Sequence, residues 1–368
     1  MLKKKLKLYY RLFIQRIFIL IYGKIKIENI NSLDDIKIKK IKNLKSDKEP
    51  NIQYLLYEIK NGRIYTDANE NVAILNKNKL ISNISFQQIS GELKDIKFNT
   101  VLKIGTPKIK KKINGNVFNL AQGGSGNNYF HFMYDLIPKI YLLEKVLSID
   151  SIDYFYVPKI KVWQKKIYLL FGIMEKKLID SDKFKHIESN LIISVNHPWY
   201  YKGYIQQEVK NIPDWIINYN RKKFLPLLKK FDNNKKIFLD RSSSVFNHCK
   251  IQNNEELIDA LSKKGFTSYK VEEFSIEEQI YLFNDADIII GAHGAAFANI
   301  MFCKPKTKII EIIPISHPNR KVERISEVLN LKHFKITTDD TNLDKNMPFN
   351  IFLNKNHLNK IFDAIDLY

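Results

Sequence analysis

One stretch, residues 287–314, constrains the fold of this chain more than any other. A short apolar run after Asp287 leads into a loop of small residues, 291–296, in which His293 is the only large side chain. Apolar residues then recur at helical spacing, and residues 307–313 form a second apolar run. A buried strand, a tight loop, a helix and another buried strand make one βαβ unit, so the stretch predicts a parallel sheet.

The loop of this unit is predicted to bind an anion. It follows the carboxyl end of a strand and opens a helix, where free backbone N–H groups and the helix dipole favour negative charge. Its small side chains let a phosphate approach the backbone closely. The loop is neither a G-x-G-x-x-G motif nor a P-loop, and an ordinary glycine-rich turn is the alternative. The candidate binding residues are Gly291, His293, Gly294, Ala295, Ala296 and Asn299.

Strands and helices alternate through the second half of the chain, which predicts a doubly wound, Rossmann-like sheet. The expected strands are 237–239, 269–271, 287–290 and 307–313. Capping boxes are predicted to begin helices at Asn253, with Glu256, and at Ser275, with Glu278. Gly265 is expected to end the first of these helices.

Cationic and polar residues follow the first of these strands. Arg241 and Ser242 lie at its carboxyl end, on the same expected rim as His293, and with Lys250 they are expected to face a diphosphate. Glu311 interrupts an apolar strand and needs a partner, either the hydroxyls of a ribose or a nearby lysine.

In the first half, a glycine-rich loop precedes a helix that carries a histidine–carboxylate pair. Asn128 is suited to cap this helix, and Pro138 is expected to kink or restart it. His131 and Asp135 are four residues apart, so their side chains can touch. The pair is interpreted as a general base with its orienting carboxylate, or as a local surface pair.

Two other features of the first half bear on the fold and the site. Asn61-Gly62 lies between two short apolar runs and predicts a β-hairpin, within antiparallel β-structure over residues 46–115. A later loop contains His197, Trp199, Tyr200 and Tyr201, which are suited either to stack on a sugar or to pack internally.

Length and composition narrow the class of protein. The 368 residues are enough for about two domains with real cores, and 45% apolar residues indicate a globular chain. The net charge of +21 is consistent with binding of anions or with a compositional bias toward lysine. Two cysteines, Cys249 and Cys303, give neither a disulfide framework nor zinc spacing, and favour a cytoplasmic protein.

The first residues are basic and apolar, and their apolar run is too short to span a bilayer. They predict an amphipathic helix lying on the inner face of an anionic membrane, or an ordinary first helix packed on its domain. Four segments are expected: a basic amphipathic segment at 1–45, an acceptor-side α/β domain at 46–230, a Rossmann-like domain at 231–335, and a tail at 336–368 packing back across the domains.

The chain resembles the family 61 glycosyltransferases, which include bacterial capsular-polysaccharide proteins. The resembling residues are Asn128 to His131 with Asp135 and Pro138, Asp240-Arg241, Lys250, 253–257, 265–266, 275–279, 286–302 and Glu311. The resemblance implies a GT-B architecture of two Rossmann-like halves facing a cleft, with a nucleotide-sugar donor on the second half and a glycan acceptor on the first. Many relatives carry arginine where Lys250 stands.

The resemblance further implies inverting transfer to a glycan hydroxyl in capsular or lipopolysaccharide synthesis, without a cofactor or bound metal. His131, Asp135 and His293 are the catalytic candidates, and Asn127, Asn128 and Tyr129 are expected on the acceptor side, where the acceptor is free or lipid-linked. Asp285 and Asp287 form a D-x-D motif, interpreted as a turn rather than a metal site. The alternatives are an S-adenosylmethionine-dependent methyltransferase and a non-enzymatic binder of anionic glycan or nucleic acid; no nucleic-acid motif is present.

Overall fold

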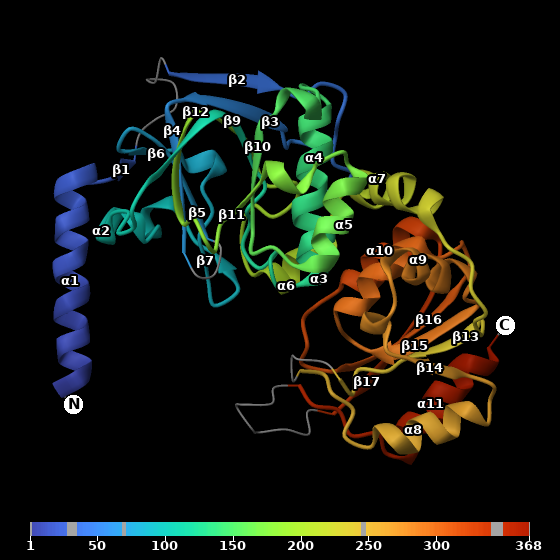
Figure 1. The fold of residues 1–368 in the computed structure, drawn as a ribbon. Coiled ribbons are helices and arrows are strands. Elements are labelled where there is room, and N and C mark those ends of the chain that lie inside the picture. The colour runs from blue at the N-terminus through green and yellow to red at the C-terminus, as the bar shows by residue number, and fades with distance from the viewer. Residues whose placement is uncertain (1, 28–34, 68–70, 244–247, 340–348, 368) are drawn as a thin grey trace. The chain divides into compact units, whose positions relative to one another are not determined.

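The computed structural model describes residues 2–27, 35–67, 71–243, 248–339 and 349–367 (Figure 1). The chain divides into two compact units, Met1–Glu208 and Val209–Tyr368. This boundary falls earlier than the expected one at residue 230. The reason is that helix α7 (Asp214–Phe224) packs within the second unit, where Arg221 Nη1 donates a hydrogen bond to the carbonyl of Cys303 (2.8 Å).

The second unit is built on a five-stranded parallel sheet in the order β14-β13-β15-β16-β17. The strands are β13 (Lys236–Leu239), β14 (Thr267–Tyr269), β15 (Ile288–Ala292), β16 (Lys308–Pro314) and β17 (Lys332–Thr338). The helices are α8 (Asn254–Ser262), α9 (Ile276–Asp285), α10 (Lys321–Leu329) and α11 (Lys355–Asp366), with the 3₁₀ helix η10 (Ala295–Phe302). Helices α9 and α10 cover one face and α8 and α11 the other, which confirms a doubly wound sheet here (Figure 1).

Local signals account for part of this unit. Ser275 and Glu278 form the predicted capping box at the start of α9. Asn253 is the N-cap residue of α8 as predicted, but the capping box is wrong, because the Asn253 side chain bonds both the N–H (3.0 Å) and the carbonyl (2.9 Å) of Leu353. The expected tail is also part of this unit: residues 336–338 lie in β17, and α11 buries Ile361 and Ile365 in the core beneath the same sheet.

The first unit contains a ten-stranded mixed sheet rather than a second all-parallel one. Its parallel part has the order β12-β9-β10-β11, formed by β9 (Lys111–Asn119), β10 (Tyr154–Val157), β11 (Leu178–Asp180) and β12 (His186–Val195). The other strands of the unit are β1 (Lys26–Ile27), β2 (Ile36–Lys40), β3 (Leu55–Lys60), β4 (Gly62–Thr66), β5 (Val72–Asn76), β6 (Lys79–Leu80), β7 (Gln88–Ile89) and β8 (Glu92–Leu93). Its helices are α1 (Leu2–Tyr22), α2 (Val101–Ile104), α3 (Tyr129–His131), α4 (Ile137–Glu144), α5 (Val162–Leu170) and α6 (Ile205–Glu208).

The hairpin predicted at Asn61-Gly62 is wrong. Strands β3 and β4 do not fold back on each other, because both run antiparallel to β12 in one continuous register. Asn61 takes a φ of 49° and donates its N–H to the carbonyl of Asn190 (2.9 Å), which forms an irregularity within one long strand. The antiparallel strands expected near the N-terminus are therefore part of the main sheet of this unit.

Candidate functional site

The switch point of the second sheet brings two loops together. The chain leaves β13 toward β14 on one side and leaves β15 toward β16 on the other, and Leu239 pairs with Gly291 between these two strands. Arg241 and His293 follow the carboxyl ends of β13 and β15 at the same edge. In open parallel sheets this edge is where ligands bind.

Arg241 lies directly against Gly294. Arg241 Nη1 donates a hydrogen bond to the backbone carbonyl of His293, and a methyl group at residue 294 would collide with the guanidinium. Gly294 has an extended backbone (φ 178°), so a larger residue here would not strain the main chain but would have to displace the guanidinium. The remaining N–H donors of a guanidinium have the geometry to bind phosphate oxygens.

His293 and Glu311 form a buried pair on the neighbouring strands. His293 Nδ1 lies 2.5 Å from Glu311 Oε1, and His333 Nε2 lies 3.1 Å from Glu311 Oε2. Burial lowers the pKa of His293 to about 3. Burial raises the pKa of Glu311, but hydrogen bonds from the two histidines outweigh it and lower that pKa to about 2. A neutral imidazole therefore donates Nδ1–H to an ionised carboxylate. Each oxygen of Glu311 is engaged by a histidine, rather than by the lysine or the ribose expected from the sequence.

Lys321 is a buried cation near the same edge that the sequence analysis did not single out. It begins α10, the helix that follows β16, and is 5% exposed. Burial lowers its pKa to about 8, while the charge of Glu311 acts in the opposite direction. Its positive charge also lowers the pKa of His293, and the charge of Arg241 in turn lowers the pKa of Lys321. Lys321 is the first residue of the helix after β16, so the parallel topology that places Arg241 at this edge places Lys321 there too.

The other predicted donor-side residues differ in exposure. Arg241, Ser242 and Lys250 line one small pocket with Asn254. The Ser242 hydroxyl donates to Asp240 Oδ2 (2.9 Å), so it holds the end of β13, whereas Lys250 is exposed. Ala295 and Ala296 open η10 beside Gly294 and are half-buried.

Asn299 is the exception among these residues. Its side chain is 1% exposed and donates to Gln279 Oε1 on α9 (2.9 Å). It therefore joins η10 to α9 and does not lie on the ligand-facing rim, contrary to expectation.

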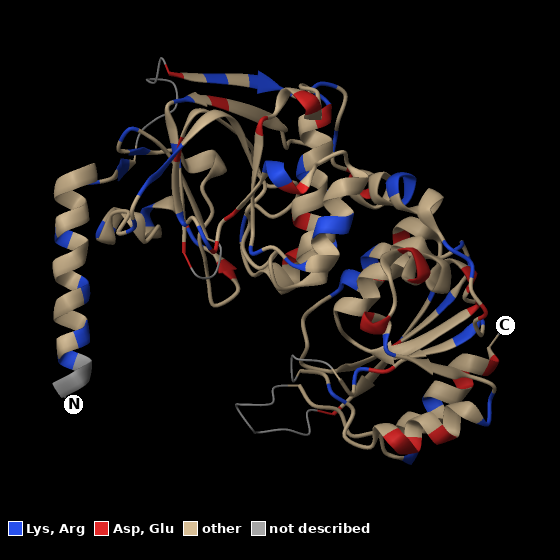
Figure 2. Cartoon of the chain, viewed as in Figure 1, with Lys and Arg blue, Asp and Glu red and all other residues tan. Residues whose placement is uncertain are grey.

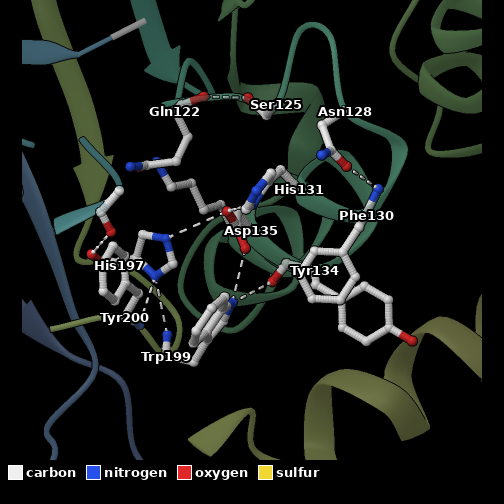
Figure 3. Close-up of polar contacts among 12 residues, drawn as sticks. Gln122, Ser125, Asn128, Phe130, His131, Tyr134, Asp135, His197, Trp199 and Tyr200 are labelled. Carbon is white, nitrogen blue, oxygen red and sulfur yellow. Dashed lines mark hydrogen bonds and ion pairs between the residues drawn. The ribbon is translucent and has the colours of Figure 1, made fainter. Parts of the chain in front are cut away.

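In the first unit, His131 and Asp135 are in contact, as predicted (Figure 3). His131 Nδ1 lies 2.8 Å from Asp135 Oδ2, and the imidazole remains 19% exposed while Asp135 is buried. Burial raises the pKa of Asp135, but His131 and His197 outweigh this effect and lower it to about 2. The arrangement is an ionised carboxylate that orients a partly accessible imidazole.

The loop after β12 holds this carboxylate from the other side (Figure 3). Trp199 Nε1 lies 2.9 Å from Asp135 Oδ1. His197 Nδ1 accepts the backbone N–H groups of Trp199 and Tyr200 (3.2 and 2.9 Å), so its proton must be on Nε2, which lies 3.9 Å from Asp135 Oδ2. Trp199 and Tyr200 are buried and therefore do not present a stacking surface for a sugar.

A π-helical segment, η4 (Phe132–Leu136), places Asp135 in this network. Pro138 has no N–H, so it cannot bond the carbonyl of Tyr134 as a helical residue would. Trp199 Nε1 also lies 3.1 Å from that carbonyl and satisfies it. The π-helical segment ends at Leu136 and α4 begins at Ile137, so the helix restarts at Pro138, one of the two expected outcomes. Such π-bulges are frequent at functional sites.

A second buried lysine adjoins the pair. Lys139 Nζ donates to Gln122 Oε1 (2.7 Å), and burial lowers its pKa to about 7, with Asp135 opposing the shift. The predicted acceptor-side residues flank His131. Asn127 is exposed, Asn128 caps α3 through the N–H of Phe130 (2.9 Å) as predicted, and Tyr129 packs edge-on against Trp163.

Within the described residues, no group of three or more histidine, cysteine, aspartate or glutamate side chains is arranged to hold a metal ion. Asp285 and Asp287 precede β15, at the amino edge of the sheet, and Asp285 lies 3.9 Å from Lys304. An open depression at this amino edge, lined by Asp232, Asn234 and Tyr269 among others, is on the side away from Arg241. Parallel α/β sheets bind their ligands at the opposite edge.

A parallel sheet with a cation at its switch point, beside a loop of small residues, defines an α/β protein suited to phosphate-bearing ligands. Comparison with known proteins specifies the class. The family model described as Glycosyltransferase 61 matches residues 129–310, a range that includes both His131 and Arg241. The chain belongs to glycosyltransferase family 61 and is a glycosyltransferase, so neither a methyltransferase nor a non-enzymatic binder describes it.

The other comparisons add little. No curated protein matches the sequence significantly. Among solved structures, the chain is similar to a dodecameric iron-containing heptosyltransferase, TibC, in complex with ADP-D-β-D-heptose, at 10% identity over 87% of this chain and 82% of that one. The TM-score is 0.26, so this likeness carries no argument about the fold, metal or substrate of the present chain.

Proposed function

We propose that this glycosyltransferase moves a sugar from a nucleotide-sugar donor to a glycan hydroxyl, with inversion and without a bound metal. In this proposal the second unit binds the donor and the first unit the acceptor, as the two halves of a GT-B enzyme. The observation that carries the proposal is the guanidinium of Arg241 held against Gly294 at the switch point of the second sheet. A fixed cation at this position is suited to a diphosphate.

The donor would bind through its diphosphate. When the bond between the anomeric carbon and the diphosphate oxygen breaks, its electron pair stays on that oxygen, and the added charge must be stabilised. Arg241 and Lys321 supply two positive charges, and the backbone of the loop at Gly294 adds N–H groups. These groups support a reaction that needs no divalent ion to neutralise the leaving group.

His131 is our candidate for the general base. The acceptor hydroxyl would give its proton to His131 Nε2 while its oxygen attacks the anomeric carbon on the face opposite the diphosphate, which inverts the configuration. Asp135 would hold the ring and stabilise the imidazolium, because its own oxygens already accept from His131 and Trp199. His293 is less suited, since it is 2% exposed and its lowered pKa makes it a weak base.

The biological role follows the resemblance to capsular-polysaccharide proteins. We assign the acceptor to a growing surface glycan, free or lipid-linked, and place the reaction on the cytoplasmic side of the membrane. Neither assignment is needed for the chemistry proposed above.

The decisive experiment is incubation of the protein with a panel of nucleotide sugars, with and without EDTA, while release of nucleoside diphosphate is measured. We expect one donor to release nucleoside diphosphate at a rate that EDTA does not diminish. NMR of the product should show a β-linkage from an α-linked donor, or an α-linkage from a β-linked donor. Arg241→Ala should reduce release about ten- to a hundredfold, the range for losing a charged hydrogen bond. Arg320→Ala, at a largely exposed arginine in the same unit, is the control.

Three outcomes would contradict this proposal. Full turnover by Arg241→Ala would remove the diphosphate assignment. Loss of activity in EDTA with recovery on adding Mg²⁺ or Mn²⁺ would show that a metal is required. Retention of the anomeric configuration would exclude single displacement with His131 as base.

A further inference from the structure

The first helix carries an apolar stripe that remains exposed. Six large apolar residues of α1 are each between 59% and 85% exposed: Leu6, Tyr9, Tyr10, Phe13, Leu20 and Ile21. Their spacing, with the half-buried Ile17 between Phe13 and Leu20, places them on one face of the helix along nearly its whole length. An exposed apolar stripe of this kind normally marks a surface that binds another protein or a membrane.

The opposite face of α1 is fixed to the first unit. Gln15 is buried, and the Tyr22 hydroxyl accepts the N–H of Lys110 (3.0 Å). The Tyr22 ring packs edge-on against His186 with centroids 5.0 Å apart. Gly105 lies so close to Ile19 that an added methyl group would be 2.9 Å from its Cγ1. The stripe is therefore held facing away from its own unit.

The charges on α1 have one sign (Figure 2). Lys3, Lys4, Lys5, Lys7, Arg11 and Arg16 are basic, and the first acidic residue of the chain is Glu28. At helical spacing Lys5 and Arg16 fall along one border of the stripe and Lys7 beyond the other border. A second copy of the chain would bring like charges together, whereas an anionic lipid surface complements them. No helix of the described residues is long and apolar enough to cross a bilayer.

We propose that α1 docks the protein on an anionic lipid bilayer. The helix lies in the plane of the surface, with the apolar stripe in the boundary between headgroups and acyl chains and the flanking cations beside the lipid phosphates. This geometry holds the first unit at the membrane, where a lipid-linked acceptor would be presented. The docking stands on α1 alone and does not depend on the proposed transfer reaction.

The test is co-sedimentation of the full chain with vesicles of phosphatidylcholine, with or without phosphatidylglycerol. We expect binding to the anionic vesicles only, and loss of binding at high salt. The triple variant Leu6→Gln, Phe13→Gln, Leu20→Gln should bind at least about a hundredfold more weakly, because three apolar side chains no longer enter the lipid. Arg16→Gln should weaken binding about fivefold, the contribution of one cation near such a surface.

A matched control is the double variant Val162→Gln, Leu169→Gln. These side chains are 76% and 64% exposed on α5 of the same unit, so it should bind vesicles as the wild type does. Because all the substituted residues are exposed, each variant should keep its melting temperature. Unchanged vesicle binding by the triple variant, or equal binding to neutral vesicles, would overturn the proposal. So would a wild-type dimer that ignores vesicles and that the triple variant converts to a monomer, since a second copy would then cover the stripe.

Discussion

Trp199 Nε1 lies 2.9 Å from Asp135 Oδ1 and 3.1 Å from the carbonyl of Tyr134, so one indole N–H serves two acceptors on a helix distant in sequence. The carbonyl needs this donor because Pro138 cannot supply one, and the carboxylate needs it because it is buried. The indole thereby fixes the carboxylate against which His131 is oriented.

Trp199→Phe should therefore impair catalysis as well as stability. The substitution removes the indole N–H that bonds the buried carboxylate of Asp135 and the buried carbonyl of Tyr134. Loss of this donor should lower the free energy of unfolding by about 1–3 kcal/mol. If His131 is the base, turnover per folded molecule should also fall, and KM for the donor should not change. Tyr200→Phe is the control, because it removes a hydroxyl bonded to the carbonyl of Gly203 (2.6 Å) in the same loop without touching Asp135. Equal turnover in the two variants would argue against a catalytic role for the His131–Asp135 pair.

Gly294→Ala should weaken donor binding. The added methyl group displaces the guanidinium of Arg241, so KM for the nucleotide sugar should rise about tenfold or more, as for loss of one charge-assisted hydrogen bond. Gly265→Ala is matched, because its methyl group meets nothing within 4 Å although its φ is +80°. That variant should lose stability through backbone strain while keeping its KM. A normal KM in Gly294→Ala would mean that the position of Arg241 is unimportant for the donor.

The alternating pattern of the second half predicts β13, β15 and β16, because each is an apolar run bounded by helix signals. It places β14 two residues too late, at 269–271, because Thr267 and Ser268 are not apolar. It misses β17, in which lysines and threonines interrupt the apolar residues. The first half is harder to predict. Asn61-Gly62 has the composition of a hairpin turn, yet the partner of both flanking runs is β12, more than a hundred residues later, and only tertiary pairing reveals it.

The candidate site shows the same division between local and distant information. Contact between His131 and Asp135 follows from their spacing on a helix, and the shared edge of Arg241 and His293 follows from parallel topology. The donors that Trp199 and His333 provide to Asp135 and Glu311 do not follow from any local pattern, because each is brought to its carboxylate by folding of the sheet.

Lys321→Met should change the pH dependence of donor binding. The pKa of Lys321 is lowered to about 8, so its ammonium is present below that pH and is lost above it. If this cation binds the diphosphate, KM for the donor should rise in the wild type as pH increases through 8, and the variant should show a higher KM with a weaker pH dependence. Lys308→Met, at a buried lysine that begins β16 at the amino edge of the sheet, should retain the wild-type profile. Identical profiles for the wild type and Lys321→Met would exclude this role.

The His293–Glu311 pair should make the protein sensitive to acid. The pKa of His293 falls from 6.5 to about 3 on folding and that of Glu311 from 4.5 to about 2, so between these limits the unfolded chain binds more protons than the folded one. Stability should therefore decrease as pH falls from about 6.5 toward 3, with the contribution of Glu311 present above 4.5 and lost toward 2. Urea unfolding at several pH values across this range measures the free energy of unfolding.

Glu311→Gln keeps an acceptor for His293 but removes the charge, so its unfolding free energy should depend less on pH below 4.5. Glu323→Gln, at an exposed carboxylate of α10, should retain the wild-type slope, and an unchanged slope in Glu311→Gln would show that the acid sensitivity arises elsewhere.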